Sequence, residues 1–73
     1  MKYDVNKAFG KRLTDIRQNM GLSQEEFAEQ CGIHRTYLGN LERGEKSPTL
    51  NTIAKIAENL NMKIKDFFKE DDE

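Results

Sequence analysis

LSQEEFAEQCGIHRTYLGNLERG, residues 22–44, is the stretch of sequence that decides the fold. It contains two short helical patterns, each followed by a glycine that can adopt the left-handed conformation ending a helix. These glycines are Gly32 and Gly44. Ser23 and Glu26 form an S-x-x-E capping box, in which each side chain accepts a hydrogen bond from the other residue's backbone N–H. The stretch therefore predicts two helices joined by a tight turn, at 23–31 and 34–43.

The apolar residues of this stretch fall on one side of each predicted helix. They are Leu22, Phe27, Ala28, Cys31, Ile33, Leu38 and Leu41. At about 3.6 residues per turn, Thr36, Asn40 and Arg43 lie on the outward side of the second helix, with Arg35 in its first turn. Such side chains pair with base edges and phosphates, and a compact helix–turn–helix commonly places its second helix in the DNA major groove. A merely solvated polar face is the alternative, but the matched caps and the short turn favour DNA recognition.

Length and composition exclude several classes of protein. The 73 residues suffice for one small domain, which gains stability from association. Cys31 is expected in the core, and one Cys with one His, His34, supplies neither a metal cluster nor a nucleophile–base pair. We therefore predict no cofactor, no metal and no enzymatic activity. No apolar run is long enough for a membrane span or a signal peptide, so we expect a soluble, cytoplasmic protein.

The charge is unevenly distributed along the chain. The formal net charge is −1, but four of the thirteen acidic residues crowd at 70–73. Residues 1–69 carry twelve basic and nine acidic side chains, a net charge of +3. A sequence-specific DNA binder needs a local positive face rather than a basic whole. We therefore predict a DNA-binding domain over 1–69 and an acidic, disordered tail over 70–73, which either weakens non-specific DNA binding or adds solubility.

Apolar periodicity predicts three further helices. The first begins after Asp4, as its N-cap, and ends at Gly21; another begins after Thr49; a last short helix is expected near 63–69. The apolar stripes of the two longer helices are Val5, Phe9, Leu13, Ile16 and Met20, and Leu50, Ile53, Ala54, Ile56, Ala57 and Leu60. No segment alternates with a period of two. The predicted fold is all-α, a compact bundle of five short helices.

The run LTDIRQNMGLSQEEFAEQCGIHRTYLGNLERGEKSPTLNTIAKIAENL, residues 13–60, resembles the phage repressor/Cro type of helix–turn–helix, the xenobiotic-response-element regulators of bacteria. The resemblance extends over roughly 6–68. The chain is also similar to restriction–modification controller proteins, because it is short, carries HRTY at the start of the recognition helix and shows no effector domain. The family resemblance implies a lambda repressor-like fold. It also implies a transcriptional regulator that binds double-stranded DNA as a homodimer on a pseudo-palindromic operator. No small-molecule effector is evident.

The resemblance also implies roles for individual residues. The residues implied to read bases are Arg35, Thr36 and Asn40. Those implied to contact the DNA backbone are Gln24, Tyr37, Arg43, Lys46, Ser47, Thr49 and Asn51, and Gln24 is also implied to brace the recognition helix. Arg17 and Glu42 are implied to form an ion pair between the first and third helices.

Two positions depart from the family pattern. His34 stands where a Ser, Thr or Asp usually caps the recognition helix, so we expect a weaker helix start. Gly39 stands where the family often has Ser, and in mid-helix it costs about 0.5–1 kcal/mol relative to Ala. Gly39 either lets the backbone approach DNA closely or is a tolerated substitution without a function.

The last two predicted helices carry more apolar residues than so small a bundle can bury. These residues form the predicted dimer interface: Leu60, Met62, Ile64, Phe67 and Phe68. One of the two phenylalanines is expected to belong to the core instead. A second class of function stays open, an antitoxin or adaptor module whose main role is to bind a partner protein. Co-purification of a stoichiometric partner would distinguish it.

Overall fold

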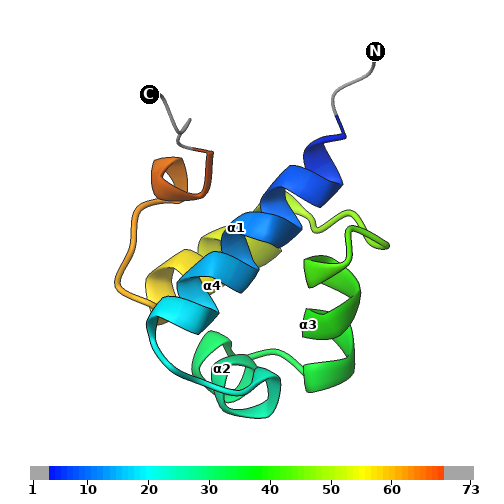
Figure 1. Cartoon of the computed structure of the whole chain (residues 1–73). Coiled ribbons are helices and arrows are strands. Elements are labelled where there is room, and N and C mark those ends of the chain that lie inside the picture. Colours follow the sequence, from blue (N-terminus) through cyan, green and yellow to red (C-terminus); the bar gives the residue numbers. More distant parts are fainter. Residues whose placement is uncertain (1–3, 69–73) are drawn as a thin grey trace.

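The computed structural model describes residues 4–68, and these residues form four α-helices and a C-terminal 3-10 turn (Figure 1). The elements are α1 (Val5–Asn19), α2 (Gln24–Cys31), α3 (Arg35–Glu42), α4 (Leu50–Asn59) and the 3-10 turn η1 (Ile64–Phe68). No strand occurs in this part of the chain, so the all-α prediction is confirmed. None of its helices is long and apolar enough to cross a membrane. The predicted tail at 70–73 lies outside the described residues.

Three helices begin at the N-caps predicted from the sequence, and three end next to the predicted glycines. Ser23 Oγ accepts from the Glu26 backbone N–H at 3.1 Å, and the Glu26 carboxylate accepts from the Ser23 N–H at 2.9 Å, which completes the capping box. Asp4 and Thr49 cap α1 and α4 with one bond each: their side chains accept from the Lys7 and Thr52 backbone N–H groups. The glycines predicted to end helices all have positive φ: Gly21, Gly32 and Gly44.

The prediction of a fifth α-helix near 63–69 is wrong, because the structure forms the 3-10 turn η1 there. The Asp66 backbone N–H donates to the Lys63 carbonyl at 2.9 Å, and the Asp66 carboxylate accepts from the Lys63 N–H at 3.1 Å. Five residues are too few for the successive i→i−4 bonds of a stable α-helix, so these tighter bonds are formed instead. Arg12 of α1 donates to the Asp66 carbonyl at 3.0 Å and fixes the turn to the helices.

One apolar core joins all five elements. Within residues 4–68 it consists of Phe9, Leu13, Phe27, Ala28, Cys31, Leu38, Leu41, Ile53, Ile56, Ala57 and Phe67. The predicted seam between α2 and α3 is buried except for Leu22 and Ile33, which are partly buried. The ends of the apolar stripes, Val5, Met20 and Leu50, are exposed, because only the middle turns of these helices reach the core.

Gly10 allows α1 to lie directly against the C-terminal end of α3. A Cβ atom added at Gly10 would stand 2.6 Å from the Glu42 carbonyl oxygen and still closer to that of Leu41. Backbone atoms cannot move aside as a flexible side chain can, so no other residue fits at this crossing. From the sequence alone, Gly10 would be taken as a modest local cost in a helix; in the structure it sets the distance between α1 and α3.

Candidate nucleic-acid interface

The two helices of the helix–turn–helix, α2 and α3, meet at one end of the molecule, with α3 along its edge (Figure 1). Leu38 and Leu41 lie on one side of α3 and are buried in the core. Arg35 and Thr36 are exposed at its N-terminal end. The helix therefore has an inner side fixed by packing and an outer side open to a ligand.

An ion pair anchors the inner side of α3. Arg17 of α1 donates to the Glu42 carboxylate through two nitrogens, Nε at 2.8 Å and Nη2 at 3.2 Å. The two side chains are only 16% and 5% exposed. Gln24, at the start of α2, donates to the same carboxylate at 2.8 Å, and Arg17 Nη1 donates to the Leu22 carbonyl at 3.2 Å. Glu42 thus holds α1, α2 and α3 together, and Gln24 braces α3 through it.

Cys31 lies in the core close to this anchor. Burial raises the pKa of the Cys31 thiol to about 12, and the negative charge of Glu42 adds to the rise. A neutral, buried thiol is neither a nucleophile nor a metal ligand at physiological pH. In residues 4–68 no group of three or more His, Cys, Asp or Glu side chains is placed to hold a metal ion.

His34 caps α3 despite its departure from the family pattern. Its Nδ1 accepts from the Thr36 backbone N–H at 3.0 Å, the bond that a Ser, Thr or Asp cap would otherwise make. The bond requires a lone pair on Nδ1, so the proton of a neutral ring must be on Nε2. The histidine thereby provides the helix start that the sequence pattern left weak.

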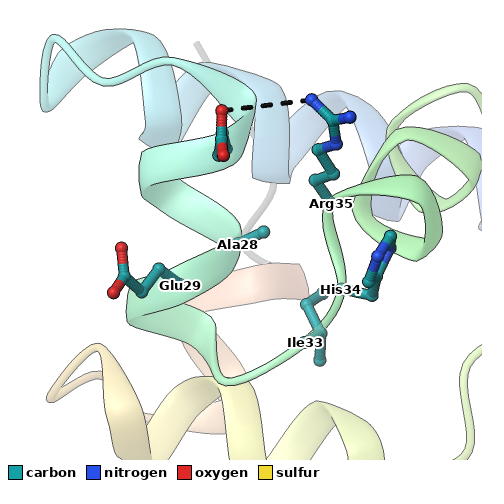
Figure 2. Close-up of a pocket in the computed structure, with 6 residues that line it drawn as sticks. Ala28, Glu29, Ile33, His34 and Arg35 are labelled. Carbon is teal, nitrogen blue, oxygen red and sulfur yellow. Dashed lines mark ion pairs between the residues drawn. The ribbon is translucent and has the colours of Figure 1, made fainter.

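On the outer side, the first residue of α3 is held only loosely. Arg35 Nη1 lies 3.9 Å from a Glu25 carboxylate oxygen, and the two side chains are 65% and 77% exposed. Figure 2 shows this pair as a dashed line from Arg35 across an open recess to α2. The recess is lined by Glu25, Ala28, Glu29, Ile33, His34 and Arg35. An exposed pair at this distance contributes little to stability, so Arg35 can exchange Glu25 for another partner.

A second group of polar side chains lies at the C-terminal end of α3. Arg43 Nη2 donates to the Asn40 side-chain oxygen at 2.8 Å, and Arg43 Nε lies 3.0 Å from a Glu45 carboxylate oxygen. A second recess of the outer face brings Arg43 near other residues that were predicted to bind DNA. Its lining is Gln24, Glu25, Arg35, Thr36, Gly39 and Arg43.

The remaining residues predicted to contact the DNA backbone lie outside that lining. Lys46, Ser47 and Asn51 are exposed in the loop after α3 and the first turn of α4. Thr49 uses its hydroxyl to cap α4, where it accepts from the Thr52 N–H at 3.1 Å. Tyr37 is partly buried and packs against the core, so only part of its side chain is open to a ligand.

Two acidic residues of this surface, Glu25 and Glu45, were not predicted from the sequence. Each pairs with an arginine predicted to bind DNA, but neither pair has the i,i+4 spacing that identifies a partner along one helix. The available signal was chemical: an acidic residue in a segment expected to face phosphates. Such a residue needs either a basic neighbour or a position away from DNA.

Comparisons with known proteins agree with this geometry. A family model described as helix-turn-helix matches residues 13–67. The control protein C.SmaI of Serratia marcescens is 38% identical over 61 residues, covering 84% of this chain and 73% of that protein. The control protein C.BamHI of Bacillus amyloliquefaciens is 36% identical over 67 residues, covering 90% and 83%. The crystal structure of the restriction–modification controller protein C.AhdI from Aeromonas hydrophila matches with a TM-score of 0.81 and 38% identity, covering 90% of this chain and 100% of that one.

Proposed function

Because this chain belongs to the helix-turn-helix family of DNA-binding transcriptional regulators, we propose that it acts as a homodimer on a pseudo-palindromic operator. In each copy, α3 enters the major groove, with Arg35, Thr36 and Asn40 toward the bases. The names of the relatives support a regulator over the alternative of an antitoxin or adaptor module. Their likeness further supports a narrower role, that of a controller of a restriction–modification system.

The observation that carries this proposal is the contrast between the two sides of α3. Its inner side is fixed by the Arg17–Glu42 pair, whereas Arg35 on its outer side has only a weak, exposed partner. A rigid helix that presents a long, replaceable cation is suited to bidentate recognition of guanine through O6 and N7. The loop after α3, with Lys46, is then suited to grip the phosphates.

A binding experiment distinguishes base recognition by Arg35 from phosphate contact by Lys46. Arg35→Ala is expected to weaken operator binding by about 1–3 kcal/mol and to relax the preference at one base pair per half-site. Lys46→Ala is expected to weaken operator and scrambled DNA alike and to lower the salt slope by about one unit per monomer. Both are measured on the two DNAs over a salt series. If Arg35→Ala weakens scrambled DNA as much as operator, Arg35 only contacts phosphates and the proposed base reading by Arg35 is wrong.

A homodimer is proposed because one copy carries one recognition helix. Two successive major grooves are about 34–36 Å apart, so two copies are needed to reach both. Of the predicted interface residues, Phe67 is 3% exposed and packs on Phe9, so it belongs to the core. Ile64 and Phe68 are each 47% exposed. The proposed contact therefore rests on these two, with the partly buried Leu60 and Met62 beside them.

The proposed dimer is tested by introducing charged side chains into its interface. Replacing Ile64 and Phe68 together by Lys is expected to give a folded monomer, because charges cannot be accommodated in an apolar two-fold contact. Met20→Lys is the control, since Met20 is a comparably exposed residue, at 44%, beyond the far end of α1. Sedimentation measures the association state and circular dichroism the fold. An unchanged dimer in the double variant would place the interface elsewhere.

The narrower role as a controller predicts where the operator lies. An inverted repeat recognised by this protein is expected next to the promoter of its own gene. Footprinting of that DNA with the purified chain locates the protected bases. Protection centred on an inverted repeat supports the proposal, and protection without two-fold symmetry contradicts the homodimer model.

A further inference from the structure

Asn40, Arg43 and Glu45 form a chain of contacts at the C-terminal end of α3. The Glu45 carboxylate lies 3.0 Å from Arg43 Nε, and Arg43 Nη2 donates to Asn40 Oδ1 at 2.8 Å. From these contacts we propose that Arg43, held by Glu45, restricts Asn40 to the recognition of hydrogen-bond acceptors, so that Asn40 selects guanine rather than adenine. The inference rests on the proposed function, because it assumes that α3 lies in the major groove.

The orientation of the Asn40 amide follows from the chemistry of its partner. A guanidinium group only donates hydrogen bonds, so the side-chain oxygen of Asn40, and not its nitrogen, must face Arg43. The amide NH₂ group then points away from Arg43 and is the part of Asn40 left for a ligand. In this state the side chain offers two donors at its free end.

Gly39 makes room for this arrangement. A Cβ atom added at Gly39 would lie 3.2 Å from Arg43 Nη1 and 3.8 Å from Cζ, so the guanidinium rests against the bare backbone of α3. The sequence alone leaves the role of Gly39 open between a close approach of DNA and a substitution without a function. In the structure the space next to this glycine is occupied by Arg43.

The arrangement changes which base Asn40 can recognise. A free asparagine side chain binds adenine with two bonds, accepting from N6 and donating to N7. That contact needs the oxygen and the nitrogen of the amide to face the base together, and here the oxygen is directed to Arg43. Guanine presents two acceptors in the major groove, O6 and N7, which match an amide that offers only donors.

Selection from a randomised DNA duplex library with the full-length chain tests the inference. The position read by Asn40 is the one whose base preference is lost in Asn40→Ala. In the unsubstituted protein this position is expected to be guanine. In Arg43→Met, which keeps an unbranched side chain without donors, the preference at that position is expected to shift toward adenine by roughly 5-fold or more.

Lys46→Met is the matched control, because it removes one cation from the neighbouring loop without touching Asn40. It is expected to lower affinity and to leave the base at the Asn40 position unchanged. The inference is overturned if that position is adenine in the unsubstituted protein, if Arg43→Met keeps guanine, or if no position depends on Asn40. Failure of the proposed function looks different: no inverted repeat is then enriched by any of these proteins, and the inference falls with it.

Discussion

An arginine–carboxylate pair lies on each side of α3, and the two pairs have opposite consequences. On the inner side, Glu42 is 5% exposed and accepts bonds from Arg17 and Gln24 at 2.8 to 3.2 Å. On the outer side, Glu25 is 77% exposed and lies 3.9 Å from Arg35. An arginine–carboxylate pair is part of the fold in the first place and a replaceable contact in the second.

Burial explains the difference. Once a pair is out of water, removing one partner leaves an uncompensated charge, so the other partner cannot be released without a large cost. The Arg35–Glu25 pair is longer and more exposed; it is solvated in either state and screened by salt, so a phosphate or a base can take the place of its carboxylate. The exposure of an ion pair, as well as its distance, therefore has to be known before a structural or a functional role is assigned.

The largest effect is expected from breaking the inner pair. Arg17→Ala or Glu42→Ala is expected to lower the free energy of unfolding by about 3–5 kcal/mol, because each leaves a buried charge without its partner. Removing both is expected to cost less than the sum of the single changes. Urea denaturation of the four proteins gives this double-mutant cycle, and Arg17→Lys serves if the alanine variants do not fold.

The outer pair supplies the control for that cycle. Glu25→Ala is expected to change the free energy of unfolding by no more than about 1 kcal/mol. A loss as large as that of Glu42→Ala would break the comparison between the two sides. Simple additivity of Arg17→Ala and Glu42→Ala would show that their contact contributes nothing.

Two glycines sharpen the same comparison at a smaller scale. Gly10→Ala is expected to destabilise by about 1–3 kcal/mol or more, because its Cβ meets the backbone carbonyls of α3. Gly39→Ala is the matched control, since its Cβ meets only the flexible end of Arg43. There the gain in helix propensity, about 0.5–1 kcal/mol, is expected to offset the contact. Thermal unfolding of both variants measures the difference, and equal losses would contradict it.

The smallest effect is expected on non-specific DNA binding. Glu25→Gln removes a negative charge beside Arg35 and keeps the shape of the side chain. We expect non-operator duplex to bind more tightly by less than about 5-fold at low salt, because an exposed pair is weak. Glu29→Gln is the control, with the same change in net charge on a side chain that points away from Arg35 (Figure 2). Equal gains in the two variants would assign the effect to net charge alone.

Local signals in the sequence predicted most of the fold. The capping residues, the left-handed glycines and the apolar seam depend on neighbours within a few positions, and the structure has them as predicted. The error at η1 came from a segment too short for periodicity to distinguish an α-helix from a 3-10 turn. The Arg17–Glu42 pair, which joins residues 25 positions apart, was implied by the resemblance.

The features that were missed depend on distances between elements. A glycine inside a helical pattern reads as a local cost, and only the crossing with α3 shows why Gly10 is needed. The pairs made by Glu25 and Glu45 join side chains from different elements or from a loop, where no fixed spacing applies. The outer face of α3 could therefore be predicted from the sequence, but not the acidic residues that pair with its arginines.

The anchoring of α3 from one side has a consequence for directed evolution. Arg17, Gln24 and Glu42 hold the helix without using Arg35 or Thr36, so a library that varies the two exposed positions starts from a scaffold that those changes hardly touch. Most members of such a library are expected to retain the fold and, on the proposed function, to differ in the DNA they prefer. A regulator built in this way can acquire a new operator through a few surface substitutions, without a compensating change in its core.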